Sequence, residues 1–219
     1  MTIVTAGVVL VRRRWRETDR LATLYTERLG KVAARFPGVD KPAGKLKAFS
    51  EPLVHAEFRL YGRVGRDMVT VTGGRLIDTH PGLREDLDST VRGLRMCELL
   101  NRLTPERSAN PEKYRLLVEA LTLLEHRVSP WTEVSFGLRL LEAAGFGLEL
   151  SPVADEHRET WEALHKGPEG WARLGDDPAR VGRLTDFVDR ALHVHLDAPL
   201  KTSLFGESLA RASAQRVHA

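Results

Sequence analysis

Apolar and polar residues alternate along much of the first 80 positions, with the period of two that is typical of half-buried β-strands. The alternation is clearest in residues 52–62, PLVHAEFRLYG, where one face collects Val54, Ala56, Phe58 and Leu60. Comparable patterns predict four further strands, at residues 2–15, 21–30, 31–36 and 67–78. The glycine pair at 73–74 predicts a bulge or kink in the last of them. Five short strands with turn residues between them favour a small barrel or sandwich, and they are compatible with an OB-type barrel.

The period changes to that of helices after residues 80–82, HPG. Apolar residues in 83–103 are spaced as on one face of a helix that should end before Pro105, and Asn110 followed by Pro111 predicts the start of another. Further helices are expected in residues 130–147, 155–167, 177–196 and 201–213. We therefore predict an α+β fold, with a five-stranded OB-type barrel at residues 1–80 and an all-helical domain at residues 81–219.

Charge is unevenly divided between these two parts. Residues 1–80 hold 15 Lys and Arg against 8 Asp and Glu, a net of +7, whereas residues 81–219 hold 18 against 22, a net of −4. Such asymmetry indicates that the basic part contacts nucleic acid, and the alternative is an arginine-rich surface that is merely solvated. No apolar run approaches the ~20 residues of a membrane span, and the N-terminal residues lack the order of a secretory signal. We expect a cytoplasmic protein without membrane contact.

Motifs for catalysis are missing. The chain has no glycine-rich phosphate loop and no zincin pair, and its one cysteine, Cys97, lies in an apolar helical pattern that predicts a buried, unreactive thiol. His193 and His195 lie two residues apart on a predicted helix and so point to different sides, while Ser135 lacks the glycine of a nucleophile elbow. We expect no catalytic residue, no metal ligand and no cofactor, and an enzyme is the less favoured class. A metal or cofactor retained on purification would indicate the opposite.

Basic residues concentrate in positions 12–47, which hold 11 Lys and Arg against 4 acidic residues. Lys and Arg neutralise phosphates whatever the base sequence. The predicted DNA-binding residues are Arg12, Arg14 and Arg16 on one face of the first strand, Lys31 and Arg35 on the third strand, and Lys41, Lys45 and Lys47 on the loop after it. Prolines and glycines would keep this loop open toward phosphates, and the alternative is a long disordered loop. Trp15 could either stack on unpaired bases or be buried in the barrel.

Four motifs follow one another along the chain. The opening stretch 5–39, TAGVVLVRRRWRETDRLATLYTERLGKVAARFPGV, contains an E-x-D-R-L element, an LxTLxT strand and a Gly-Lys pair. The other three are PGLREDL at 81–87 with LLNRLTPE at 99–106, LRLLEAAGFGLEL at 138–150, and LDAPLKTSLFGESL at 196–209. In this order the four motifs resemble the RecO family of recombination mediators. The resemblance departs from the family at 151–167, where many members carry a zinc-binding cysteine cluster and this chain has none. A structural zinc is therefore not expected there.

The resemblance implies a protein that is not an enzyme. RecO-like proteins bind single- and double-stranded DNA, anneal complementary strands and, with RecR, help to load RecA onto DNA coated by single-strand-binding protein. The barrel would contact RecR, and the helical domain would contact the acidic C-terminal tail of the single-strand-binding protein. Two other readings stay open: a generic OB-fold nucleic-acid binder without annealing activity, and a protein-interaction scaffold whose arginines are only solvated.

Overall fold

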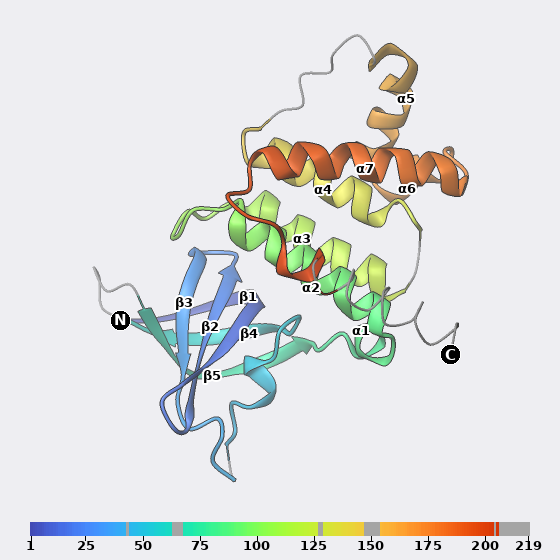
Figure 1. Ribbon diagram of the computed structural model, residues 1–219. Helices are drawn as coiled ribbons and strands as arrows, with labels where there is room; N and C mark the ends of the chain where they lie inside the picture. The colour runs from blue at the N-terminus through green and yellow to red at the C-terminus, as the bar shows by residue number, and fades with distance from the viewer. Residues whose placement is uncertain (43, 63–67, 127–128, 147–153, 204, 206–219) are drawn as a thin grey trace.

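Five strands close into a barrel in the computed structural model (Figure 1). The strands are β1 Thr2–Trp15, β2 Asp19–Thr26, β3 Gly30–Phe36, β4 His55–Tyr61 and β5 Met68–Asp78. The barrel closes in the order β1-β2-β3-β5-β4, with antiparallel neighbours except for a short parallel pairing of β3 with β5. The structure describes residues 1–42, 44–62, 68–126, 129–146, 154–203 and 205. The predicted fold class, a five-stranded barrel followed by helices, is confirmed.

Alternation along the strands fills the barrel as the sequence predicted. The four apolar residues of 54–60 are all buried inside it, with side chains from the other strands such as Leu24 and Val71. The rings of Phe36 and Phe58 meet edge to face, with centroids 6.2 Å apart. The predicted irregularity at the glycine pair is confirmed as a register shift beside Gly73.

Helices cover one end of the barrel. They are α1 Pro81–Glu85, α2 Leu87–Arg102, α3 Pro111–Glu125, α4 Thr132–Ala143, α5 Ala154–His165, α6 Pro168–Trp171 and α7 Pro178–Val194. Figure 1 shows α2 and α3 next to the strands, α4 and α7 in a further layer, and α5 farthest from the barrel. The predicted final helix begins at residues 201–203, and most of its range to 213 lies outside the described residues.

Helix ends follow local capping chemistry. The Asn110 side chain accepts hydrogen bonds from the backbone of Glu112 and Lys113, which confirms the predicted start of α3. The prediction of a single helix through residues 83–103 is wrong, because the chain is extended at Asp86 and divides it into α1 and α2. Asp86 is the N-cap of α2 and accepts from the Ser89 backbone N–H at 2.9 Å. Asp86 and Asp88 therefore mark a new helix start within the apolar pattern.

The helices and the outer surface of the barrel share one apolar cluster. Val8, Leu10, Tyr25 and Leu53 belong to the barrel segment, yet all four are buried in the cluster that the helices form. Leu53 lies over Gly93 of α2, where an added Cβ would be 3.3 Å from a Leu53 methyl group. Strands end at Asp78 and helices begin at Pro81, but the division into independent domains at residue 80 remains a prediction. Within the described residues, no helix is both long and apolar enough to cross a membrane.

Candidate nucleic-acid interface

The arginines at the end of β1 lie on two faces of the sheet. A register shift between Val9 and Val11 leaves Arg12 opposite Ala22 and Arg14 opposite Arg20. Because paired residues share a face, Arg12 and Arg14 lie on the side of the barrel interior, at its mouth. The Arg12 guanidinium forms a 3.1 Å ion pair with Glu51, whereas Arg14 is exposed.

Arg16 does not continue this row. The strand ends at Trp15, and Arg16 adopts a left-handed conformation, with φ 59°, in the turn before β2. The predicted common face of Arg12, Arg14 and Arg16 therefore holds for the first two only. Arg16 is exposed at the tip of the β1–β2 turn.

The outer face of the same strands carries Arg13 and Arg35. Arg13 of β1 and Arg35 of β3 are both paired with Leu21 of β2, which lies between them. Arg13 lies over the Trp15 ring, 5.4 Å from its centroid, and Arg35 is 3.9 Å from Asp19. Trp15 is half-buried, so its ring is neither fully exposed for stacking on bases nor fully buried in the barrel. Arg13 was not among the predicted residues, because its place beside Arg35 depends on how the strands pair, which the sequence does not show.

The lysine loop, residues 37–47, is folded into consecutive turns in its described parts, residues 37–42 and 44–47. Backbone hydrogen bonds join Lys41 to Gly38, Gly44 to Lys41 and Lys47 to Gly44, at 3.3, 2.9 and 3.3 Å. Val39 is fully buried in the barrel core, and Leu46 packs against the same core. Only glycine fits at position 44, where a Cβ would be 2.4 Å from the Val39 carbonyl oxygen. The loop is thus neither open nor formless, yet Lys41, Lys45 and Lys47 are all exposed.

Arg20 fixes this loop to the barrel. Its guanidinium donates to Asp40 and Glu51, both at 2.7 Å, and to Ser50 at 3.1 Å. The Arg20 side chain is only 9% exposed. The amino-acid sequence alone does not distinguish Arg20 from the exposed arginines around it. Strand alternation does, because Arg20 lies on the same face of β2 as Ala22 and Leu24, which point into the barrel. Asp40 lies in the lysine loop and Glu51 follows it, so these two contacts hold the loop against β2.

Lys31 lies at the opposite end of β3 from Arg35. Its ammonium donates to the Asn101 carbonyl oxygen of α2 at 2.6 Å, and its own carbonyl accepts from the Arg107 backbone N–H. Burial lowers the pKa of Lys31, and the nearby Glu106 partly offsets this effect. The ammonium therefore joins the barrel to the helices, and we leave Lys31 out of the proposed DNA-binding face.

We expect Lys31→Met to lower stability by about 1–2 kcal/mol in urea unfolding, because the hydrogen bond from the ammonium to Asn101 is lost. Its DNA affinity should keep the wild-type dependence on salt. Arg35→Met on the same strand is the matched variant, and it should flatten the log-affinity against log-salt slope by up to about one unit. A flatter slope in Lys31→Met would return Lys31 to the interface.

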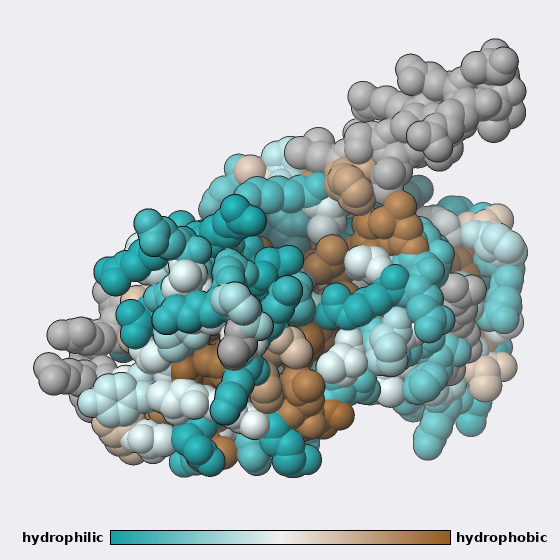
Figure 2. Space-filling view, turned by 90° about the horizontal axis from the view of Figure 1, so that it is seen from below, coloured by the Kyte–Doolittle hydropathy of each residue, from teal (hydrophilic) through white to brown (hydrophobic). Residues whose placement is uncertain are grey.

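Exposed cations gather at the end of the barrel that the helices leave free. Figure 1 shows the β1–β2 turn and the lysine loop at this end, and Figure 2 looks onto it, with long hydrophilic side chains projecting over the barrel. The basic tip consists of six exposed cations that form no ion pair with another described residue: Arg13, Arg14, Arg16, Lys41, Lys45 and Lys47. Such a cluster can neutralise phosphates over a broad area and needs no bond chemistry.

Residues considered for chemistry at the outset are engaged in packing. Cys97 is buried as predicted, and burial raises the pKa of its thiol to about 12. The Ser135 hydroxyl is buried and donates to the Leu164 carbonyl at 2.7 Å. His195 stacks on Phe146, with ring centroids 3.9 Å apart. These three side chains therefore contribute to packing within the protein.

Comparison with known proteins gives two adjoining family matches. The family model described as recombination protein O N terminal matches residues 1–80, and the one described as recombination protein O C terminal matches residues 84–164. Together they cover the barrel and the helices through most of α5.

Individual relatives agree with these matches. The chain is 34% identical over 149 residues to a DNA repair protein RecO of Heliobacterium modesticaldum, and 31% identical over 156 residues to one of Syntrophomonas wolfei. A DNA repair protein RecO of Bacillus subtilis is 32% identical over 124 residues. The alignments cover 68%, 71% and 57% of this chain, but only 54%, 60% and 48% of the relatives. The chain thus spans about half to three fifths of the length of these relatives.

Proposed function

The chain belongs to the RecO family, and from this premise we propose that it is a DNA repair and recombination mediator that binds single- and double-stranded DNA and anneals complementary strands. The observation that carries the proposal is the basic tip, six exposed cations at the free end of the barrel that have no ion-pair partner among the described residues. The protein acts as a binding surface in the cytoplasm, without enzymatic activity.

Annealing follows from the physics of the basic tip. Two complementary strands repel each other through their phosphates, and a cationic surface that contacts both lowers that repulsion and releases condensed counterions. Contact with phosphates is independent of sequence, so base pairing between the strands alone decides which of them anneal. Neither nucleotide hydrolysis nor a cofactor is required for this step.

Partners enter the proposal through the family. The barrel contacts RecR, the helical part contacts the acidic tail of single-strand-binding protein, and RecA is loaded indirectly. The helical part is acidic as a whole, so contact with an acidic tail requires local cations. A 420 Å³ hollow between α5, α6 and α7 offers local cations, since Lys166, Arg173 and Arg180 line it together with Glu159 and Glu162.

We expect the full chain to accelerate annealing of two complementary oligonucleotides, also when these are coated with single-strand-binding protein. Annealing should slow with added salt, because the phosphate contacts are screened. Binding of single strands without acceleration would instead identify a generic nucleic-acid binder. Absence of DNA binding at modest salt would leave an interaction scaffold, and would overturn the proposal.

A further inference from the structure

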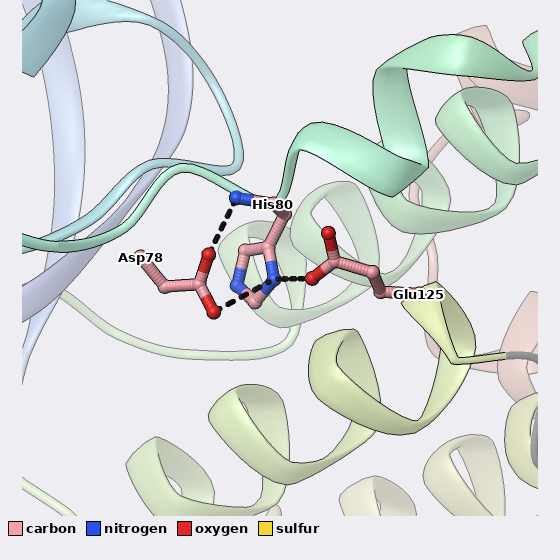
Figure 3. Close-up of side chains that lie close together, drawn as sticks. All are labelled: Asp78, His80 and Glu125. Atoms are coloured by element: carbon pink, nitrogen blue, oxygen red, sulfur yellow. Dashed lines mark hydrogen bonds and ion pairs between the residues drawn. The ribbon is translucent and has the colours of Figure 1, made fainter.

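Three potential metal ligands meet where the barrel joins the helices (Figure 3). Asp78 ends β5, His80 lies in the connection to α1, and Glu125 ends α3. One ligand atom from each residue lies within 4.8 Å of those of the other two. The His80 ring lies between the two carboxylates, with its Nδ1 2.8 Å from Glu125 and 3.6 Å from Asp78. Residues 45 positions apart are thus brought into one cluster.

The cluster carries more negative charge than its protein contacts balance. Within the described part of the chain, the ion pairs of Asp78 and Glu125 go to His80 and to no Lys or Arg. The Glu125 side chain is only 10% exposed, and its second oxygen accepts from the Gly82 backbone N–H at 2.7 Å. A neutral imidazole leaves two carboxylates close together in a partly dehydrated site, an arrangement that a divalent cation stabilises.

His80 supplies the nitrogen ligand of the cluster, since its Nδ1 faces both carboxylates. Its side chain is 1% exposed, and its Nε2 is buried without a hydrogen-bond partner among the described residues. Metal binding through Nδ1 requires the tautomer with the proton on Nε2. In that tautomer the Nδ1 lone pair points at the two carboxylates, and the Nε2 proton has no acceptor among the described residues, so the bound ion has to offset the cost of one buried N–H.

We propose that Asp78, His80 and Glu125 form a binding site for one divalent transition-metal ion, with Zn²⁺ as the representative occupant. One imidazole and two carboxylates suit zinc, which binds three protein ligands and leaves a position for water. A strict Mg²⁺ site would favour oxygen ligands alone. The ion takes the place of the proton between His80 and Glu125, and the Asp78 carboxylate, 38% exposed, is the side open to solvent.

An ion at this position links the last strand of the barrel to α3, and so holds the two parts in one orientation. This site is separate from the cysteine region in which the family resemblance raised the question of zinc, and it replaces our expectation that the chain has no metal ligands. The basic tip lies at the other end of the barrel, so DNA binding and metal binding can be tested independently.

The test uses the full chain without an affinity tag, freed of metal by a chelator. Zn²⁺ is titrated in competition with a chromophoric chelator, and Co²⁺ is added separately to record its d–d absorption. We expect one ion per chain and at least about tenfold weaker Zn²⁺ binding in Asp78→Asn and Glu125→Gln. His165→Asn is the matched control, because His165 pairs with Glu142 at 2.5 Å on the surface and with no second carboxylate among the described residues, and it should bind as the wild type does.

Asp78→Asn decides the outcome, because Asp78 is the most exposed ligand and the asparagine Oδ1 can still accept from the His80 backbone N–H. Circular dichroism verifies that this variant is folded. Less than one ion bound per wild-type chain, or unchanged affinity in Asp78→Asn, would overturn the site. Loss of binding in Asp78→Asn with retention in His165→Asn supports it, whatever the DNA affinity of the protein.

Discussion

Replacing Lys41, Lys45 and Lys47 together by alanine is expected to weaken binding to every DNA sequence about equally. All three side chains are exposed on a loop whose backbone is held by its own turns and by Val39 in the core. If all three contact phosphates, the slope of log affinity against log salt should flatten by roughly two to three units. The fold should not change, because none of the three side chains is buried. Fluorescence anisotropy at several salt concentrations gives the slope, and circular dichroism with thermal melting checks the fold.

A second triple variant distinguishes direct contact of the lysines with DNA from the general effect of removing three positive charges. Lys166, Arg183 and Arg190 are exposed on the helical part, and their replacement by alanine removes the same charge far from the basic tip. This control should change the slope much less. An unchanged slope in the loop variant would show that the lysine loop does not touch DNA, and the interface would then have to lie around the other members of the basic tip, Arg13, Arg14 and Arg16.

Arg20→Met should lower the free energy of unfolding by about 2–3 kcal/mol. The substitution keeps an apolar side chain of similar length but leaves Asp40, Ser50 and Glu51 without their shared donor. Removing one member of a buried ion pair costs about 3–5 kcal/mol, and here Asp40 and Glu51 are 28% exposed, so water can recover part of that loss. Urea unfolding measures the change.

The same substitution should also weaken DNA binding, because the lysine loop loses its attachment to β2. Arg14→Met is the matched control: Arg14 is opposite Arg20 on β1 but is exposed, so its loss should remove at most one phosphate contact and leave stability nearly unchanged. Equal stability of Arg20→Met and wild type would mean that the network of Arg20 does not hold the loop.

The barrel could be predicted because successive side chains of a strand point to opposite faces, so that apolar alternation in the sequence marks the residues that are buried. Alternation at residues 54–60 identified inward side chains correctly, and the Asn110-Pro111 pair identified the start of α3. The break at Asp86 was missed because the apolar spacing continues across it. A local hydrogen bond to Ser89 decides that break, and apolar periodicity contains no information about it.

The candidate site was predictable only in part. Charge density located the basic tip, but it could not separate the exposed Arg14 from the buried Arg20, or Lys31 beside the helices from Arg35 at the other end of β3. These distinctions depend on strand pairing and on contacts over 20 to 70 residues. The convergence of Asp78 and His80 with Glu125 is of the same kind, because it exists only once α3 has packed against the end of β5.

The shared apolar cluster also bears on how the chain is made. All five strands precede residue 79, so the barrel leaves the ribosome before the helices that cover Val8, Leu10, Tyr25 and Leu53. If the strands pair at that stage, these four side chains form an exposed apolar patch until residues up to about 124 have been synthesised and α2 and α3 can pack on it. An apolar patch of this kind favours aggregation of a growing chain.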